Sequence, residues 1–399
     1  MIKYSPFSIL ISLFLYHYFS FSVALSIATF ILTTLLLELL FDPLEIINNQ
    51  LPETTKISNP QPARGWFRLA SSTEIKQNKV FSTTLFDEKL VLWRSEEGIK
   101  CINSYCVHLG ADLSQGKVEQ GCLECPFHKW KFRGDGTVHS IPAFNGTQQP
   151  SLVTNKEKVS SPLQVKEMDG SVYVWQDPFR EKVDPWELSS PIFKTSLSKK
   201  NFFYHASSVH YLSTSLSELA ENGADVSHLS CVHEQTGIPF LTYQWEGSWQ
   251  QSEEKDKHYL GVIKQAIHIR FFGVEICPPV RIQTFQIGLG VVFVHQETPL
   301  GEMVLVHTST PISKYHIKCE MRLYCNWKMP RVFAKMFMLL TLYQFEGDVK
   351  IWNKKRLLEK PLLVSKEDRL ISTFRRWKNQ FFTPPIENQV CSNKNLLEW

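Results

Sequence analysis

The sequence predicts an α+β protein in three parts: an N-terminal transmembrane helix, a small antiparallel β domain, and a larger domain in which a sheet packs with helices. Three observations support this fold class. An uncharged apolar run occupies the N-terminus, short β-type runs separated by turn residues follow it, and long β-type runs flanked by helical patterns fill the second half. Runs of strands bounded by runs of helices are typical of α+β domains.

Residues 1–45 are predicted to form a membrane anchor. No Asp, Glu, Lys or Arg occurs between Lys3 and Glu38, and about 20 apolar residues suffice to span a bilayer. A cleaved signal peptide is the alternative, but its apolar region usually has only about 7–15 residues. We therefore expect a single membrane-spanning segment and a membrane partner.

Residues 46–63 are predicted to be a linker, since they contain Pro52, Pro60 and Pro62. Residues 64–187 are predicted to form the antiparallel β domain. Asp169-Gly170 is a hairpin signal within this domain. Its expected strands are short runs of β-branched and aromatic residues: Val80–Leu85, Leu90–Trp93, Gly98–Ile102, Leu163–Lys166 and Ser171–Trp175.

The remaining residues, 188–399, are predicted to form an α+β domain with a helix-grip-like sheet, enclosed by helices at both sequence ends. Helical patterns occur near Ser213–Val232 and from Pro330 to Asn379. The β-type runs between them are Tyr259–Phe272, Arg281–Gln296, Met303–Pro311 and Ile317–Trp327.

Composition limits the function classes. The 399 residues are 43% hydrophobic, and 43 basic and 39 acidic residues give a formal net charge of +4. Such a balance provides no strongly basic field, so we expect no nucleic-acid partner. Nine cysteines in so long a chain do not suggest a disulfide scaffold. Buried or free thiols are instead expected, together with a reducing compartment.

A first group of metal-ligand residues lies in the small β domain. It reads Cys106-Val107-His108, then sixteen residues, then Cys125-Pro126-Phe127-His128. Two thiolates and two imidazoles can hold a [2Fe–2S] cluster with both histidines on one iron, which raises its reduction potential. A zinc site is the alternative, but its usual form pairs cysteine with cysteine and histidine with histidine. The segment resembles Rieske domains, ligand for ligand.

A second group lies in the larger domain. Asp225 and His228 share one face of a regular helix, whereas His233 lies about 140° further round. Both histidines can therefore meet one metal only if the helix bulges or ends between them. Two histidines and a carboxylate on one face of an iron form the triad of non-haem Fe(II) oxygenases. Taken alone, this motif is more often a pair of surface or core histidines.

Beside the first group, the motif makes the chain similar to Rieske non-haem iron oxygenases. This resemblance implies that His228 and His233 bind a mononuclear Fe(II) and that Asp225 links His228 to His128 of a neighbouring subunit. It also implies that Asn222 is a nearby polar residue of the site. The third ligand is expected far downstream, where Glu346-Gly347-Asp348-Val349-Lys350-Ile351-Trp352 fits the family's Asp-x-x-x-Trp pattern. Asp348 is the first choice and Glu346 the second.

The resemblance also implies the cofactors and partners. Electrons from NAD(P)H would pass through a separate reductase, a ferredoxin or flavin protein, to the cluster and then to the iron, where O2 reacts. Because cluster and iron of one chain are too far apart in the family, a homotrimer is expected. Since an iron–sulfur cluster belongs in a reducing compartment, the bulk of the chain should face the cytosol, with the anchor in the endoplasmic reticulum membrane.

Three further stretches resemble the Neverland-type cholesterol 7-desaturases. They are Arg64-Gly65-Trp66-Phe67, the segment from Asn222 to His228, and the segment from Asp348 to Lys354. The resemblance implies a sterol substrate and conversion of cholesterol to 7-dehydrocholesterol. Two alternatives remain: a ring hydroxylase, such as the 3-ketosteroid 9α-hydroxylases or the plastid chlorophyll-pathway oxygenases, and a membrane-tethered Rieske electron carrier. The intact set of iron ligands argues against the carrier.

Overall fold

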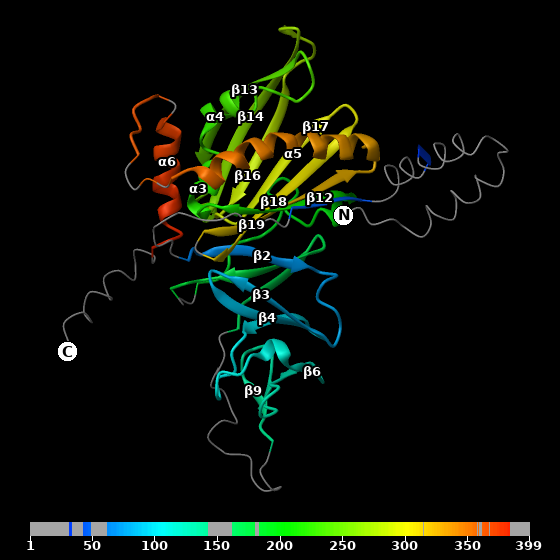
Figure 1. Cartoon of the computed structure of the whole chain (residues 1–399), viewed down its shortest axis with the longest axis vertical. Helices are drawn as coiled ribbons and strands as arrows, with labels where there is room; N and C mark the ends of the chain where they lie inside the picture. Colours follow the sequence, from blue (N-terminus) through cyan, green and yellow to red (C-terminus); the bar gives the residue numbers. More distant parts are fainter. Residues whose placement is uncertain are drawn as a thin grey trace, which may run out of the picture.

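Two β-rich domains lie one above the other along the longest axis of the molecule, as the computed structural model shows (Figure 1). The structure describes residues 32–33, 43–48, 62–142, 162–179, 183–313, 315–356, 358, 361–366 and 368–383. Over these residues the chain is mainly β-sheet with few helices, as the sequence predicts for the two domains.

The N-terminal β domain contains three small antiparallel sheets. The first pairs the beginning of the domain with its end, in the order β10-β11-β2, and the second and third follow chain order. The strands are β2 (Gly65–Ser71), β3 (Val80–Leu85), β4 (Glu88–Ser95), β5 (Gly98–Asn103), β6 (Lys117–Glu119), β7 (Cys122–Glu124), β8 (Lys131–Phe132), β9 (Val138–Ser140), β10 (Val165–Met168) and β11 (Ser171–Gln176). All five expected runs overlap these strands.

The C-terminal domain is built on one nine-stranded sheet with the order β1-β12-β19-β18-β17-β16-β14-β13, and β15 pairs with β14 at one end. Every pairing is antiparallel except that of β1 with β12. The strands are β1 (Leu44–Ile47), β12 (Phe202–Ser213), β13 (Leu241–Gln251), β14 (Leu260–Phe271), β15 (Val274–Glu275), β16 (Val280–Ile287), β17 (Val291–Thr298), β18 (Gly301–Ser313) and β19 (His316–Asn326).

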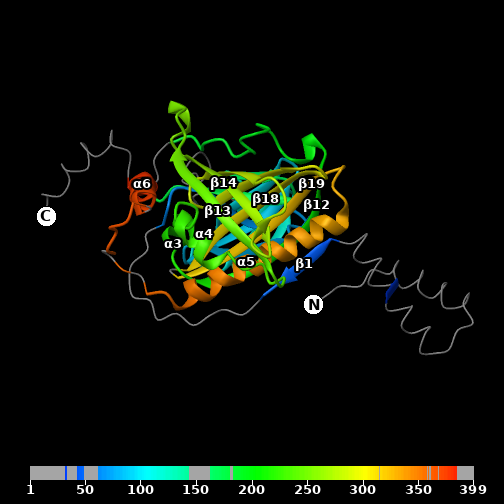
Figure 2. The same cartoon turned by 90° about the horizontal axis from the view of Figure 1, so that it is seen from above.

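Helices cover one face of this sheet. The long helix α5 (Arg331–Lys354) crosses the sheet and packs on β12, and the short helix α4 (Val226–Val232) packs on β13 (Figure 2). Helix α3 (Leu216–Glu221) precedes α4, and α6 (Asp368–Asn379) contacts both α3 and β13. Short 3₁₀ turns occur at η1 (Leu113–Gln115), η3 (Ser198–Lys200) and η4 (Lys255–Lys257).

The structure corrects several details of the expected secondary structure. The run Arg281–Gln296 is two strands, β16 and β17, joined by a turn at Gly288. Here φ is +57°, a conformation that glycine adopts readily. The helical stretch Ser213–Val232 is likewise two helices. Strands β12 and β13 were not expected, although Tyr243, Trp245 and Trp249 recur along β13 with the two-residue period of a strand.

The predicted anchor, residues 1–45, lies almost entirely outside the described residues. Within the part of the chain that is described, no helix is both long and apolar enough to cross a membrane. Residues Leu44 to Ile47, where the anchor was expected to meet the linker, instead form β1 and pair with Ala206 to Val209. The sheet of the C-terminal domain therefore takes its edge strand from the region that precedes the N-terminal β domain.

Buried side chains join the two domains. One apolar core includes Phe67 of β2 and Phe293 of β17, and a smaller core surrounds Cys106 and Cys125. Arg68 of β2 also donates to the Glu320 carboxylate of β19, and both side chains are almost fully buried. The N-terminal domain is thus attached through its own first strand.

Replacing Arg68 with alanine should lower the free energy of unfolding by about 3 kcal/mol, because Glu320 loses its closest buried partner. Two partners remain, Arg322 at 3.4 Å and Lys318 at 3.8 Å from Glu320, and they keep the loss at the lower end of the usual range. Chemical denaturation followed by circular dichroism measures it. Lys100→Ala, which breaks an exposed pair with Glu97, is the control. Equal effects of the two changes would contradict the assigned role of Arg68.

Candidate metal centres

Two loops of matching geometry present the four predicted cluster ligands. Residues 106–110 follow β5, and residues 125–129 follow β7. In the first loop the Gly110 amide donates to the Cys106 carbonyl at 2.8 Å, and in the second the Lys129 amide donates to the Cys125 carbonyl at 3.2 Å. Gly110 and Lys129 both have left-handed backbone, with φ of 70° and 61°. The sequence repeat is therefore also a repeat of backbone structure.

The two thiols lie inside and the two imidazoles outside. Cys106 and Cys125 are buried, whereas His108 is exposed and His128 half-buried. Burial raises the pKa of the Cys106 thiol, and the neighbouring Cys125 thiol adds to the rise. The two imidazole rings lie 4.7 Å apart, and Trp130 stacks on His108 at 4.6 Å. This donor set fits a [2Fe–2S] cluster whose histidine-bound iron faces the surface.

A break between α3 and α4 positions the second group. Helix α3 ends at Glu221, and Asp225 begins α4 by accepting the backbone N–H of His228. Helix α4 ends at His233, the residue after its last turn. Of the two expected possibilities, a bulge or an end of the helix between the histidines, the structure has the end, because α4 stops at Val232. A Cβ at Gly223 would lie 2.6 Å from Ile263, so a glycine lets this break approach β14.

His228, His233 and Asp348 come together where α4 faces α5. Their ligand atoms all lie within 4.8 Å of one another. The Asp348 carboxylate is 3.9 Å from Nε2 of His228 and 3.2 Å from Nε2 of His233. The two imidazole rings are 5.2 Å apart and nearly perpendicular. A Cβ at Gly347 would lie 3.0 Å from Val232, so α5 can approach α4 closely at this point.

The polar atoms of this group fit a metal ion. Nδ1 of His228 hydrogen-bonds to the Asp225 backbone carbonyl, whereas its Nε2 is buried without a hydrogen-bond partner. Nδ1 of His233 is also buried and unpartnered. A hydrogen bond from one ring nitrogen fixes the tautomer and leaves the other nitrogen free for a metal. Two imidazoles with one carboxylate are the donors that non-haem Fe(II) sites use.

The structure also distinguishes between the two carboxylates that were predicted as the third ligand. Asp348 is buried and faces the histidines, whereas Glu346 contacts Nε2 of His210 on β12 at 3.0 Å. The remaining predicted residues lie beside the group. Asn222 donates to Asp348 Oδ2 at 3.2 Å, and the Asp225 side chain, 34% exposed, lies 4.0 Å from Nδ1 of His228.

Replacing Asn222 with alanine should weaken metal binding at the second group by about 10–100-fold, because a hydrogen-bonded ligand loses its orienting partner. Titration of the metal-depleted protein with Fe(II) under anaerobic conditions measures this affinity. Asn353, which lies on α5 like Asp348, is a matched control, since its side-chain oxygen accepts only the Ser213 N–H among the described contacts. Equal affinity for wild type and Asn222→Ala would show that Asn222 does not orient Asp348.

Sequence reasoning missed His210 and His307, two histidines on the sheet beneath α5. Both rings contact Phe345, at 5.2 and 5.8 Å. His307 is half-buried, and the protein around its ring displaces water; this desolvation lowers its pKa to about 4. A histidine in the middle of an apolar strand was the available signal. His307 thus adds a neutral imidazole to the surroundings of the Asp348 carboxylate, whereas the acidic neighbour of His210 is Glu346.

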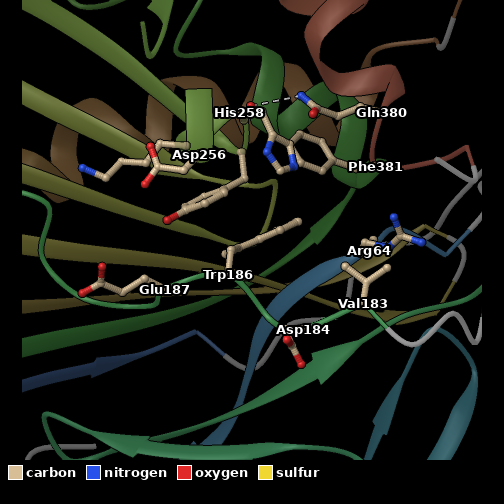
Figure 3. A pocket seen from close by; sticks show the side chains of 11 residues that line it. Arg64, Val183, Asp184, Trp186, Glu187, Asp256, His258, Gln380 and Phe381 are labelled. Atoms are coloured by element: carbon tan, nitrogen blue, oxygen red, sulfur yellow. Dashed lines mark hydrogen bonds between the residues drawn. The ribbon is translucent and has the colours of Figure 1, made fainter. Parts of the chain in front are cut away.

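A cavity of about 350 Å³ lies elsewhere, between the start of the N-terminal domain and the end of α6 (Figure 3). Arg64, Trp186, His258 and Phe381 line it, and none of the residues of either metal group does. We therefore assign it no role in the chemistry of these groups.

Comparisons with known proteins agree with this geometry. Residues 65–157 match the family Rieske [2Fe-2S] domain, and residues 174–382 match the 3-Ketosteroid 9alpha-hydroxylase C-terminal domain. Dicamba monooxygenase bound to dicamba has the same fold, with a TM-score of 0.58 at 15% identity over 79% of this chain and 96% of that one. The chain is thus an oxidoreductase of the Rieske oxygenase class, with a Rieske cluster and a mononuclear iron.

Individual relatives narrow the class. "Cholesterol 7-desaturase nvd" of Xenopus laevis is 32% identical over 84% of this chain and 75% of its own length. The protein of the same name from Bombyx mori is 31% identical over 86% and 75%. The oxygenase component of 3-ketosteroid-9-alpha-monooxygenase from Rhodococcus rhodochrous is 26% identical over 80% of both chains. The chain belongs to the cholesterol 7-desaturase family of Rieske oxygenases.

Proposed function

We propose that the enzyme introduces a C7–C8 double bond into a sterol, converting cholesterol to 7-dehydrocholesterol. One observation carries this proposal: seven relatives named cholesterol 7-desaturase match at 29–32% identity over 82–88% of this chain. The sterol loses two hydrogens, and NAD(P)H supplies two electrons through a separate reductase. The two hydrogens from the sterol, the two electrons and two protons together reduce O2 to two molecules of water.

In this proposal Cys106, His108, Cys125 and His128 hold the cluster, and His228, His233 and Asp348 hold the iron. When bound, the iron would supply the O2-dependent removal of hydrogen from a ring carbon of the sterol. The protein keeps the Nε2 atom of His228 directed at the metal through the Asp225 carbonyl. Asn222 holds the Asp348 carboxylate in place.

Asp225 is proposed to carry electrons between subunits. The cluster loops and helix α4 lie toward opposite ends of the molecule (Figure 1), so electron transfer within one chain is disfavoured. Yet the cluster histidines are accessible at the surface, and the Asp225 carboxylate is partly exposed beside His228. A homotrimer in which His128 of one subunit meets Asp225 of the next joins these two surfaces.

We also propose that the residues before β1 anchor the enzyme in the endoplasmic reticulum membrane by a single span, with both domains in the cytosol. The absence of charged residues between Lys3 and Glu38 supports this proposal, as does the requirement of the cluster for a reducing compartment.

Sterol profiling of cells that express the full chain and are fed cholesterol tests the function. We expect 7-dehydrocholesterol to accumulate. A second candidate, ring hydroxylation, is favoured by the family match of residues 174–382. A hydroxysterol without any 7-dehydro product would support hydroxylation and overturn the desaturase proposal.

A further inference from the structure

One end of the C-terminal sheet carries an unusual concentration of exposed apolar side chains. They project from the hairpin-like tip formed by the loop before β13 and the β14–β15 turn, which extends beyond the rest of the sheet (Figure 1). Side chains of the tip that are between 43% and 67% exposed are Ile238, Phe240, Phe271, Phe272, Val274 and Ile276. Contiguous exposed apolar patches mark interaction sites. We call these six residues the apolar tip.

The backbone of the apolar tip is held in an uncommon conformation. Phe240 and Phe272 have φ of 62° and 49°, a region that bulky residues rarely adopt. The Phe272 amide donates to the Phe240 carbonyl at 2.9 Å, and the two rings stack with centroids 4.3 Å apart. Strain of this kind usually persists where it has a function. Here it fixes a pair of aromatic rings at the surface of the protein.

The same end of the sheet carries further exposed apolar residues and receives the N-terminal segment. Leu300 lies in the β17–β18 turn, and Trp327, which is 74% exposed, follows β19. Phe202, which begins β12, pairs with Asn326, which ends β19. Strand β1 runs parallel to β12, so β1 also begins at this end, and in the sequence it follows the apolar N-terminal run.

The apolar tip is also directly connected to the second metal group. Its first loop begins at Glu234, the residue after His233. Gly237 of this loop packs on Tyr343 of α5, where a Cβ would lie 3.0 Å from the tyrosine ring. The Gln344 side chain donates to the Gln235 carbonyl at 2.8 Å. The apolar tip and the iron ligand His233 are therefore joined by a few residues of one loop.

We propose that the apolar tip inserts into the surface of a phospholipid bilayer and brings the catalytic domain to membrane-dissolved sterol. The inference rests on the proposed function, because a sterol substrate resides in the bilayer. The six tip residues carry no charge, and the carboxylate of Glu275, which lies among them, is paired with His268 at 3.0 Å, so the tip fits the acyl–headgroup boundary of a bilayer. Amphipathic elements of this kind bury their apolar side about 5–10 Å deep. Strand β1, which follows the proposed anchor in the sequence, begins at the same end of the sheet, so one membrane can serve both contacts.

Photo-crosslinking of the full-length holoenzyme tests the contact itself. The enzyme is reconstituted in phosphatidylcholine vesicles that contain a phospholipid with a photoreactive acyl chain, and crosslinked peptides are identified by mass spectrometry. We expect crosslinks within residues 238–240 and 271–276, and none at Leu362 or Val364, which are exposed apolar residues after α5. Crosslinks of the tip to a second copy of the chain, or an absence of lipid crosslinks there, would overturn the proposal.

Steady-state kinetics test whether the apolar tip brings the enzyme to sterol in the membrane. In the double variant Phe240→Asn and Phe272→Asn, asparagine tolerates the left-handed backbone, so folding is preserved. We expect the KM for cholesterol in vesicles to rise about tenfold, while kcat and the KM for cyclodextrin-delivered cholesterol stay unchanged. The control variant, Leu362→Asn with Val364→Asn, should change neither. Equal KM changes for both delivery modes would overturn a membrane role. If no sterol is desaturated at all, the proposed function fails, and the lipid crosslinks still decide the contact.

Discussion

Replacing His233 with alanine should remove the mononuclear iron and reduce sterol turnover by more than about 100-fold, since even changes outside the ligand shell commonly cost 10–100-fold. His233 lies 3.2 Å from Asp348 and is buried, so no solvent-exposed group can take its place. The cluster is held by another domain and should keep its visible absorption. Iron analysis should give two irons per chain in the variant and three in the wild type.

Glu346→Gln is the matched control for this prediction. Glu346 is two residues from Asp348 on the same helix but contacts His210. The variant should keep three irons per chain and most of its activity. Loss of the cluster spectrum in His233→Ala would contradict the separation of the two centres. Loss of one iron in Glu346→Gln would instead assign the third ligand to Glu346.

Replacing Asp225 with asparagine should leave both metal centres loaded but lower turnover by about 10–100-fold, a range typical for the outer partners of metal ligands. Asparagine is as good a helix N-cap as aspartate, whereas alanine costs about 0.5–2 kcal/mol. Asp225→Asn thus removes the charge and keeps the start of α4. Asp225→Ala should lose both turnover and thermal stability.

Stopped-flow reoxidation of the reduced cluster, in the presence of O2 and sterol, measures the step that Asp225 controls. We expect slow reoxidation in Asp225→Asn and wild-type rates in Ser227→Ala, which removes only the hydroxyl that donates to Asp225. Unchanged cluster reoxidation in Asp225→Asn would contradict a role in electron transfer and leave Asp225 as the cap of α4.

Local patterns determine how much of this structure can be predicted from the sequence. The cluster loops were predictable because both ligands of each arm lie within four residues and the two arms share one geometry. Strand β3 was predicted with its observed bounds, since it is a short hairpin strand between turn residues. By contrast, β12 was missed because Ser207, Ser208 and His210 interrupt its apolar pattern, although all three are buried. Their burial depends on the distant helix α5.

The second centre shows the same limit. The five-residue spacing of His228 and His233 was enough to indicate an interruption of the helix between them. The choice of Asp348 over Glu346 depends on which side of α5 faces α4, a relation between segments more than 100 residues apart in the sequence. The position of β1 was equally unpredictable, because its partner β12 lies beyond the whole N-terminal β domain.

Turnover of cholesterol carrying two deuterium atoms at C7 tests the central proposal most directly. The purified full-length enzyme, with a reductase, NAD(P)H and O2, should give a 7-dehydro product that retains one deuterium and gains no oxygen. The same product should be absent with His233→Ala. A product that has gained one oxygen atom and no second ring double bond would contradict the desaturase account and identify the enzyme as a hydroxylase.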